Sequence, residues 1–148
     1  MKKKMLFLCI VSMLLFMSCA KKSADNDFDY KAFLALLTES GFSYVEEELD
    51  STLNFLSVAR RPLFIGDEVI SVYEYESNQK MEKDSKYVDK NGLGISRPGN
   101  GVRISWISTP YFFKKGRLIV NYVGKDEQIL NFLTEHLGSE FAGGRYAN

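Results

Sequence analysis

Hydrophobic and polar positions change their period within the first half of the chain. Between Asp29 and Gly41 the apolar residues recur at helical spacing, which predicts a helix that Asp29 caps and Gly41 ends. Beyond Gly41, apolar and polar residues alternate, a pattern typical of strands. We expect strands over residues 42–46, 61–65 and 69–75, the last two joined as a hairpin across Gly66-Asp67-Glu68.

The second half of the chain predicts two further helices and a second hairpin. The helix that Ser77 caps has few apolar positions, so we expect it to be mostly exposed. The loop after it contains four glycines and a proline, and is expected to be mobile. The predicted elements are a helix over 77–88, a loop over 91–101, alternating residues at 102–107, a hairpin after Pro110 that turns at Lys114-Lys115-Gly116, a central return strand at 118–123 and a helix over 126–137.

Together these elements run in the order α-β-β-β-α-β-β-α, and most of the strands are joined as hairpins. Hairpins favour an antiparallel sheet, so the sequence predicts a single α+β domain over residues 29–143. We expect a mainly antiparallel sheet of about five strands with the helices packed on one face. Residues 144–148 are predicted to be a C-terminal tail.

The N-terminus has the pattern of an export signal. Three lysines at 2–4 precede an apolar run from Met5 to Met17, which is too short to cross a bilayer as a helix. The segment Leu15-Phe16-Met17-Ser18-Cys19 resembles a bacterial lipobox, although that motif prefers leucine at the position of Phe16 and a small residue at that of Met17. The resemblance implies a signal peptide over residues 1–18, a diacylglycerol on Cys19 and a polar tether over 19–28.

An ordinary signal peptidase is the alternative, because Ser18-Cys19-Ala20 also fits its cleavage pattern and would release a soluble chain from Lys21. We favour lipidation, since a cysteine closes the apolar run and polar residues follow it. The expected location is then the outer face of the cell membrane, with the membrane as a partner through the lipid on Cys19. Cys9 lies within the signal, so no disulfide is expected in the mature chain.

Charge argues against nucleic acid as a partner. Removal of residues 1–18 lowers the 19 basic residues by three, to 16, against 19 acidic ones. Binding to phosphate backbones needs a concentrated basic face, which a slightly acidic exported domain lacks. The mature 130 residues suffice for one core.

Few residues suggest chemistry. His136 is the only histidine and lies in the apolar arc of the last helix, so we interpret it as a residue at the edge of the core. Without a second histidine or a usable cysteine, no metal site, cofactor or catalytic triad is predicted. Glu46 and Glu48 fit a solvated edge strand. Glu74 and Glu76 share one strand face and could imitate a pair of catalytic carboxylates, although neighbours on one strand also do so by chance.

An aromatic segment is the strongest candidate for binding. Large rings flank Pro110 and two lysines follow them, a combination that can form a binding ridge. The alternative is that the rings alternate into the core and leave only the lysines exposed, because a domain without disulfides needs large apolar side chains. The candidate residues are Trp106, Tyr111, Phe112, Phe113, Lys114 and Lys115.

Several short strand and turn patterns lie along residues 70–143: Ile70-Ser71-Val72-Tyr73-Glu74-Tyr75, Ile104-Ser105-Trp106, Pro110, Phe113-Lys114-Lys115-Gly116, Tyr122-Val123-Gly124 and Phe141-Ala142-Gly143. With these segments the chain resembles a family of small uncharacterised lipoproteins of Gram-positive bacteria. The likeness covers about residues 33–143 and implies the lipid anchor, but no substrate or catalytic residue.

The sequence therefore favours a lipid-anchored extracytoplasmic binding module without catalysis, whose partner is an envelope protein or a cell-wall component. Two alternatives stay open. One is a surface-tethered inhibitor that blocks an exported hydrolase with a loop such as 91–101. The other is a small hydrolase that uses carboxylates alone, Glu74 with Glu76 or with a partner from elsewhere.

Overall fold

The computed structural model describes residues 27–50 and 55–147. The predicted signal peptide, Cys19 and most of the tether lie outside these residues. The described chain forms α2 (Tyr30–Glu39), β1 (Val45–Glu46), β2 (Arg60–Ile65), β3 (Glu68–Glu74), α3 (Asn78–Ser85), β4 (Gly94–Arg97), β5 (Asn100–Arg103), β6 (Pro110–Lys115), β7 (Leu118–Val123), α4 (Glu127–Leu137), β8 (Ala142–Gly143) and the 3-10 turn η1 (Gly144–Tyr146).

Six strands form one antiparallel sheet in the order β1-β2-β3-β7-β6-β8. The predicted hairpins are β2–β3 and β6–β7, and their inner strands β3 and β7 pair with each other in the centre of the sheet. Both sheet edges are strands of only two residues. The predicted α+β class and the antiparallel sheet are confirmed.

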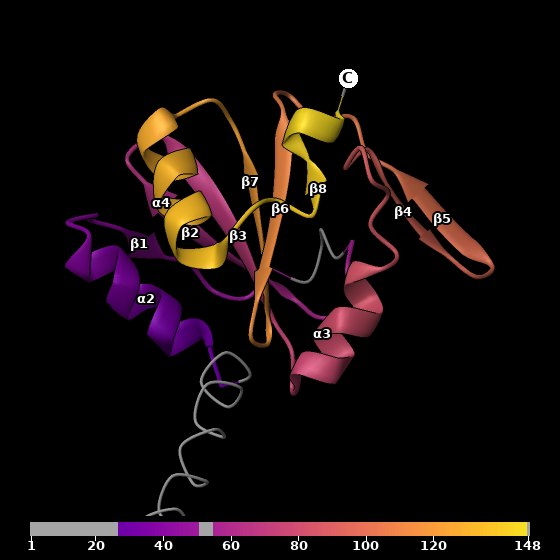
Figure 1. The fold of residues 1–148 in the computed structure, drawn as a ribbon, viewed down its shortest axis with the longest axis horizontal. Helices are drawn as coiled ribbons and strands as arrows, with labels where there is room; N and C mark the ends of the chain where they lie inside the picture. Colours follow the sequence, from indigo (N-terminus) through magenta and orange to yellow (C-terminus); the bar gives the residue numbers. More distant parts are fainter. Residues whose placement is uncertain (1–26, 51–54, 148) are drawn as a thin grey trace, which may run out of the picture.

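The helices α2 and α4 cover one face of the sheet (Figure 1). Each begins at an aspartate whose side chain accepts a hydrogen bond from the first turn: Asp29 from the Ala32 N–H and Asp126 from the Ile129 N–H, both at 2.9 Å. Their apolar stripes pack on alternate residues of the strands, which places a continuous core between helices and sheet. The fully buried members of this core are Phe33, Leu37, Leu63, Ile70, Leu118, Val120, Tyr122 and Leu133.

The helix α3 lies on the opposite face of the sheet, together with the β4–β5 hairpin (Figure 1). The prediction that the helices share one face holds for α2 and α4 only. The physical reason is that β3 and β7 are apolar on both sides, so that Tyr73 and Ile119 point away from α2 and α4 and need a second cover. Met81 of α3 supplies it and is itself 1% exposed.

Two local predictions differ from the structure. Most of the segment expected as a loop over 91–101 pairs as β4 and β5, whose turn contains Gly99 at a positive φ of 76°. The strand expected over 42–46 is reduced to Val45–Glu46, both exposed. No helix in the described ranges is long and apolar enough to cross a membrane.

Candidate functional site

The candidate aromatic residues do not gather into one ridge. Phe112 and Phe113 are 3% and 1% exposed, and as neighbours on β6 they enter the two different cores on opposite faces of the sheet. Tyr111 is half-buried and stacks on Tyr122, with ring centroids 6.4 Å apart. The arrangement of these rings follows the alternative in which they alternate into the core.

The two lysines of this segment are held by neighbouring helices. Lys114 donates to a carboxylate oxygen of Glu82 on α3 at 2.6 Å, and Lys115 donates to the carbonyl oxygen of His136 on α4 at 2.8 Å. Both lysines are half-buried. Their contacts join the β6–β7 hairpin to the two layers that cover the sheet.

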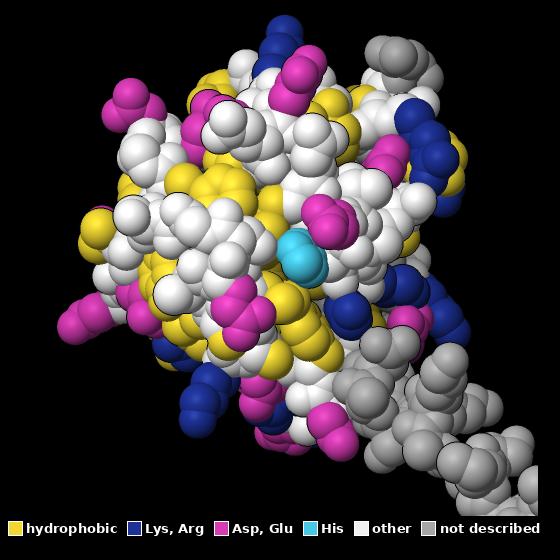
Figure 2. Space-filling view, turned by 60° about the vertical axis from the view of Figure 1, so that its left-hand side comes forward, with side chains coloured by type: hydrophobic (Ala, Val, Ile, Leu, Met, Phe, Trp, Pro, Cys, Tyr) yellow, Lys and Arg dark blue, Asp and Glu magenta, His cyan; other side chains and the backbone are white. Residues whose placement is uncertain are grey.

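His136 lies at the edge of the core, as the helical arc predicts. Its ring centroid is 4.8 Å from that of Phe132, and its Nε2 is 3.3 Å from the Ser40 hydroxyl. Figure 2 shows the imidazole at the surface of the α2 and α4 side, beside hydrophobic side chains. Its neighbours are thus an aromatic ring and a hydroxyl group.

The carboxylates proposed as a catalytic pair belong to different surroundings. Glu74 accepts a hydrogen bond from the Tyr30 N–H and forms an ion pair with Arg117 at 2.9 Å. Glu76 lies beyond the end of β3, with its side chain 81% exposed, and pairs with Lys80 of the same segment. Each carboxylate therefore has its own basic partner.

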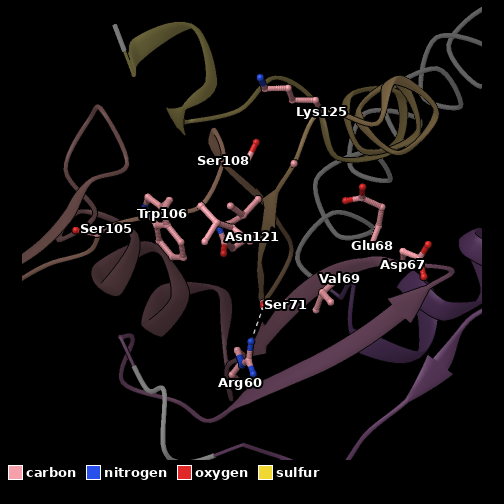
Figure 3. Close-up of a pocket in the computed structure, with 13 residues that line it drawn as sticks. Arg60, Asp67, Glu68, Val69, Ser71, Ser105, Trp106, Ser108, Asn121 and Lys125 are labelled. Carbon is pink, nitrogen blue, oxygen red and sulfur yellow. Dashed lines mark hydrogen bonds between the residues drawn. The ribbon is translucent and has the colours of Figure 1, made fainter.

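The best candidate site is a pocket on the face of the sheet that α3 covers only in part. It has a volume of about 670 Å³ and opens at the end of the sheet where the β2–β3 turn meets the segment after β7. Figure 3 shows Trp106 on one side of this pocket and Glu68 and Val69 on the other, with Asn121 and Ser71 between them. We call it the sheet pocket.

Its floor carries a polar pair among the apolar residues in the middle of β3 and β7. Ser71 of β3 and Asn121 of β7 are directly paired in the register, and they are 7% and 3% exposed. Directly opposed side chains lie about 5 Å apart at their Cβ atoms, so these two groups face the pocket together. Asn121 Nδ2 donates to the Tyr111 carbonyl oxygen at 3.2 Å, and its Oδ1 accepts no hydrogen bond from the described residues.

Trp106 forms the wall of the sheet pocket and has a fixed orientation. Its Nε1 donates to the Gly92 carbonyl oxygen at 2.7 Å. The indole also packs edge to face with Phe55 and Phe112, at centroid distances of 5.7 and 6.2 Å. The neighbouring Ile107 is 100% exposed. An indole held by one hydrogen bond and two rings provides a rigid, half-buried surface next to the polar pair.

Arg60 lines the end of the pocket that lies farthest from the β2–β3 turn. Its Nη2 forms an ion pair with Asp50 at 2.8 Å, and its Nη1 lies 3.5 Å from the Ser71 hydroxyl oxygen. The buried Arg60 Nε has no hydrogen-bond partner among the described residues. This end of the pocket therefore has a guanidinium whose charge is balanced by a carboxylate.

The rim near the β2–β3 turn is fixed by a hydrogen-bonded tyrosine. Tyr122 donates from its hydroxyl to Glu68 at 2.7 Å and accepts from the Asp126 N–H at 2.9 Å. Burial, and next the hydrogen bond to Glu68, raise the pKa of Tyr122 to about 12. A Cβ on Gly124 would lie 2.2 Å from that hydroxyl oxygen, so any other residue there would displace the Tyr122 side chain.

A second cavity, beside α3, is lined by a buried carboxylate with several hydrogen-bond donors. Asp84, 4% exposed, accepts from the Ser57 N–H at 2.8 Å, from the Tyr75 hydroxyl at 2.7 Å and from Arg97 at 2.7 Å. Burial raises the pKa of Asp84, but these hydrogen bonds and the Arg97 charge outweigh it and lower that pKa below the usual range. A buried carboxylate that binds donors from three segments holds these segments together.

Comparisons with protein-family models, with curated proteins and with solved structures found no match. The described residues contain no group of three or more histidine, cysteine or carboxylate side chains placed to hold a metal ion.

The sequence prediction included Trp106 and missed the floor of the site. Its signal was present, because Asn121 interrupts the apolar return strand and Ser71 interrupts the apolar strand over 69–75. A polar residue on a buried strand face is uncommon unless it has a partner or a function.

Proposed function

We propose that the protein is a lipid-anchored extracytoplasmic binding module and that its ligand occupies the sheet pocket. The observation that supports this most strongly is the Ser71–Asn121 pair. Two buried polar side chains with unused hydrogen-bonding capacity face an open cavity beside a rigid indole, which is the composition of a recognition site. The proposal includes kinship with small lipoproteins of Gram-positive bacteria.

The position of the pocket suits an anchored domain. The chain enters the domain at Phe28, whose carbonyl oxygen accepts a hydrogen bond from the Arg117 N–H just before β7. The pocket lies at the other end of the same strand, near Val123. Six residues of a strand span roughly 17 Å, so the pocket opens well away from the N-terminal side of the domain. On a membrane, it would be accessible to molecules of the envelope.

The anchor is tested by Cys19→Ala in the native host. We expect this variant to lose labelling by fatty acid and retention in the membrane fraction, because the thiol is the acylation site. Cys9→Ala is the matched control, since it changes the chain's other cysteine and should keep both properties. Unchanged membrane retention of Cys19→Ala would refute the anchor.

Binding is tested with the full mature chain in detergent micelles, sedimented with purified cell-wall sacculi. The wild type should co-sediment, whereas Asn121→Leu, which removes the amide and keeps the branched shape of the side chain, should not. Asn131→Leu is the matched control, because it makes the same change on an exposed position of α4. Equal sedimentation of Asn121→Leu and wild type would show that the sheet pocket is not the binding site.

A further inference from the structure

We infer that the sheet pocket recognises an uncharged sugar residue of an envelope glycan. This inference rests on the proposed binding function and specifies its ligand. It follows from the polar groups of the lining, its charge balance and the state of the strands beneath it. Each of these excludes a different class of ligand.

The charges of the lining do not suit an ion. The pocket is lined by two basic side chains, Arg60 and Lys125, and by the acidic Asp67 and Glu68, while Arg60 is already paired with Asp50. A site for phosphate or carboxylate needs an excess of positive charge or a cluster of N–H donors, and a cation needs a cluster of oxygen ligands. The balance of charge in the lining favours a neutral ligand.

The floor of the pocket excludes a purely apolar ligand. Such a ligand would seal off the Asn121 amide and the Ser71 hydroxyl from water without hydrogen-bonding to them. An unsatisfied buried polar group costs about 1–3 kcal/mol, so two of them would cancel much of the gain from burying apolar surface. The ligand therefore carries both hydrogen-bond donors and hydrogen-bond acceptors. At the rim, the hydroxyl groups of Ser105 and Ser108 can also form hydrogen bonds with it.

The strands beneath the pocket disfavour an extended peptide. A peptide that adds to a sheet needs free backbone groups at a strand edge. Here the floor is formed by β3 and β7, and each of them is paired on both sides, β3 with β2 and β7, and β7 with β3 and β6. Only side chains project from the floor toward a ligand.

A sugar ring satisfies all three conditions. Its hydroxyl groups donate and accept at the ring edge, where the planar Asn121 amide and the Ser71 hydroxyl can bind two neighbouring groups. Its ring face consists of C–H bonds and packs on the half-buried indole of Trp106, whose orientation is fixed by the bond to Gly92. The sheet pocket thus offers hydrogen bonds below and an aromatic surface at the side.

The test uses Trp106 as a reporter, because it is the only tryptophan of the chain and lines the pocket. The full mature chain in detergent micelles is titrated with the tetramer of N-acetylglucosamine, with maltotetraose, with peptide-free glycan strands released from host sacculi by an amidase, and with tetra-alanine. We expect at least one saccharide to change the Trp106 fluorescence saturably and to displace the protein from sacculi. Tetra-alanine should do neither.

The variants locate the effect. Asn121→Leu should weaken the binding of the saccharide by about tenfold or more, because one or two hydrogen bonds are lost. Asn131→Leu should leave the affinity unchanged. Ser71→Ala is the second variant if Asn121→Leu fails to fold, and is expected to weaken binding in the same direction.

The outcomes separate the two proposals. If sacculi bind in an Asn121-dependent way but none of the saccharides competes, or if tetra-alanine competes instead, the sugar is wrong and the binding function stands. If the sacculi themselves do not bind the wild type, the proposed function fails first.

Discussion

Replacement of Asp84 by alanine removes the centre of a buried hydrogen-bonded cluster. Its carboxylate joins three parts of the described chain: the segment at Ser57, β3 with the residue after it, Tyr75, and the β4–β5 hairpin through Arg97. Alanine leaves these donors in place without an acceptor. The variant therefore measures how strongly the second layer is attached to the sheet.

The magnitude follows from the exposure of each donor. The Tyr75 hydroxyl is buried, so leaving it unpaired costs about 1–3 kcal/mol, and the Ser57 N–H adds about 1 kcal/mol. The Arg97 side chain is 30% exposed and can be hydrated, so its share is small. Alanine returns roughly 0.6 kcal/mol through its better helix propensity in α3. The expected net loss in the free energy of unfolding is about 1.5–3.5 kcal/mol.

Urea unfolding of the full mature chain in detergent micelles, followed by circular dichroism, measures this loss. With a slope of about 1.5 kcal/mol per molar urea, the midpoint should fall by between about 1 and 2 M. Tyr75→Phe is the matched comparison, since it removes one hydrogen bond and keeps the ring, and should cost about 1 kcal/mol. A loss below about 1 kcal/mol for Asp84→Ala would refute the reasoning, because the buried donors would then have found other partners.

One further variant tests the titration of Asp84, and two others test different parts of the structure. Asp84→Asn should make the stability of the protein less dependent on acid. The lowered pKa of Asp84 stabilises the fold above the ordinary aspartate pKa of about 3.9, and this stability is lost as pH falls through the pKa of the folded state. In acid-unfolding curves, the difference in stability between Asp84→Asn and wild type should therefore shrink below about pH 4. Gly143→Ala places a Cβ 2.0 Å from the Pro110 carbonyl oxygen and should lower the urea midpoint strongly. Gly99→Ala is the control, because Gly99 has a similar positive φ but open space around it, and its substitution should cost only about 1 kcal/mol. Equal urea midpoints for the two variants would contradict this prediction. Phe113→Leu should lower the free energy of unfolding by about 1–2 kcal/mol and leave sedimentation with sacculi unchanged, because Phe113 is buried in the core. If the variant instead lost binding to sacculi at unchanged stability, the aromatic segment around Phe113 would be the binding site.

Local signals predicted the elements well. Asp29 and Ser77, expected as caps, and Asp126, expected to open the last helix, each accept a hydrogen bond from the first turn. Such caps are short-range interactions, so neighbouring residues are sufficient to recognise them. The two hairpins followed from alternation and turn residues. The central place of residues 118–123 followed from a run that is apolar on both faces.

The placement of α3 could not be obtained by the same means. Its narrow apolar stripe indicates an exposed helix, while the demand for a second cover comes from Tyr73 and Ile119 in distant strands. The glycine-rich residues 94–103 form β4 and β5 because Ile95 is buried in the second core and pairs with Val88 through a β-bridge. Tertiary packing here overrides the local preference of glycine for loops.

The candidate site depends on register, which explains why it was only partly anticipated. Trp106 was identified by its residue type, but Ser71 and Asn121 are 50 positions apart and become neighbours only through the β3–β7 pairing. That pairing joins the inner strands of two separate hairpins, and the alternation within each strand does not specify it. The sequence indicates this pair only through one polar residue in each of the two apolar strands.

The brevity of the two outer strands has a consequence for proteins crowded in one plane. β1 and β8, at the margins of the sheet, are two residues long, and η1 follows β8 directly. Long unpaired margins invite neighbouring copies to continue a sheet from one molecule to the next. If the proposed anchor is correct, copies that share a membrane meet at high local density and in similar orientation, the circumstances in which such association is easiest. The two short outer strands then offer a neighbouring copy few backbone groups for continuing the sheet.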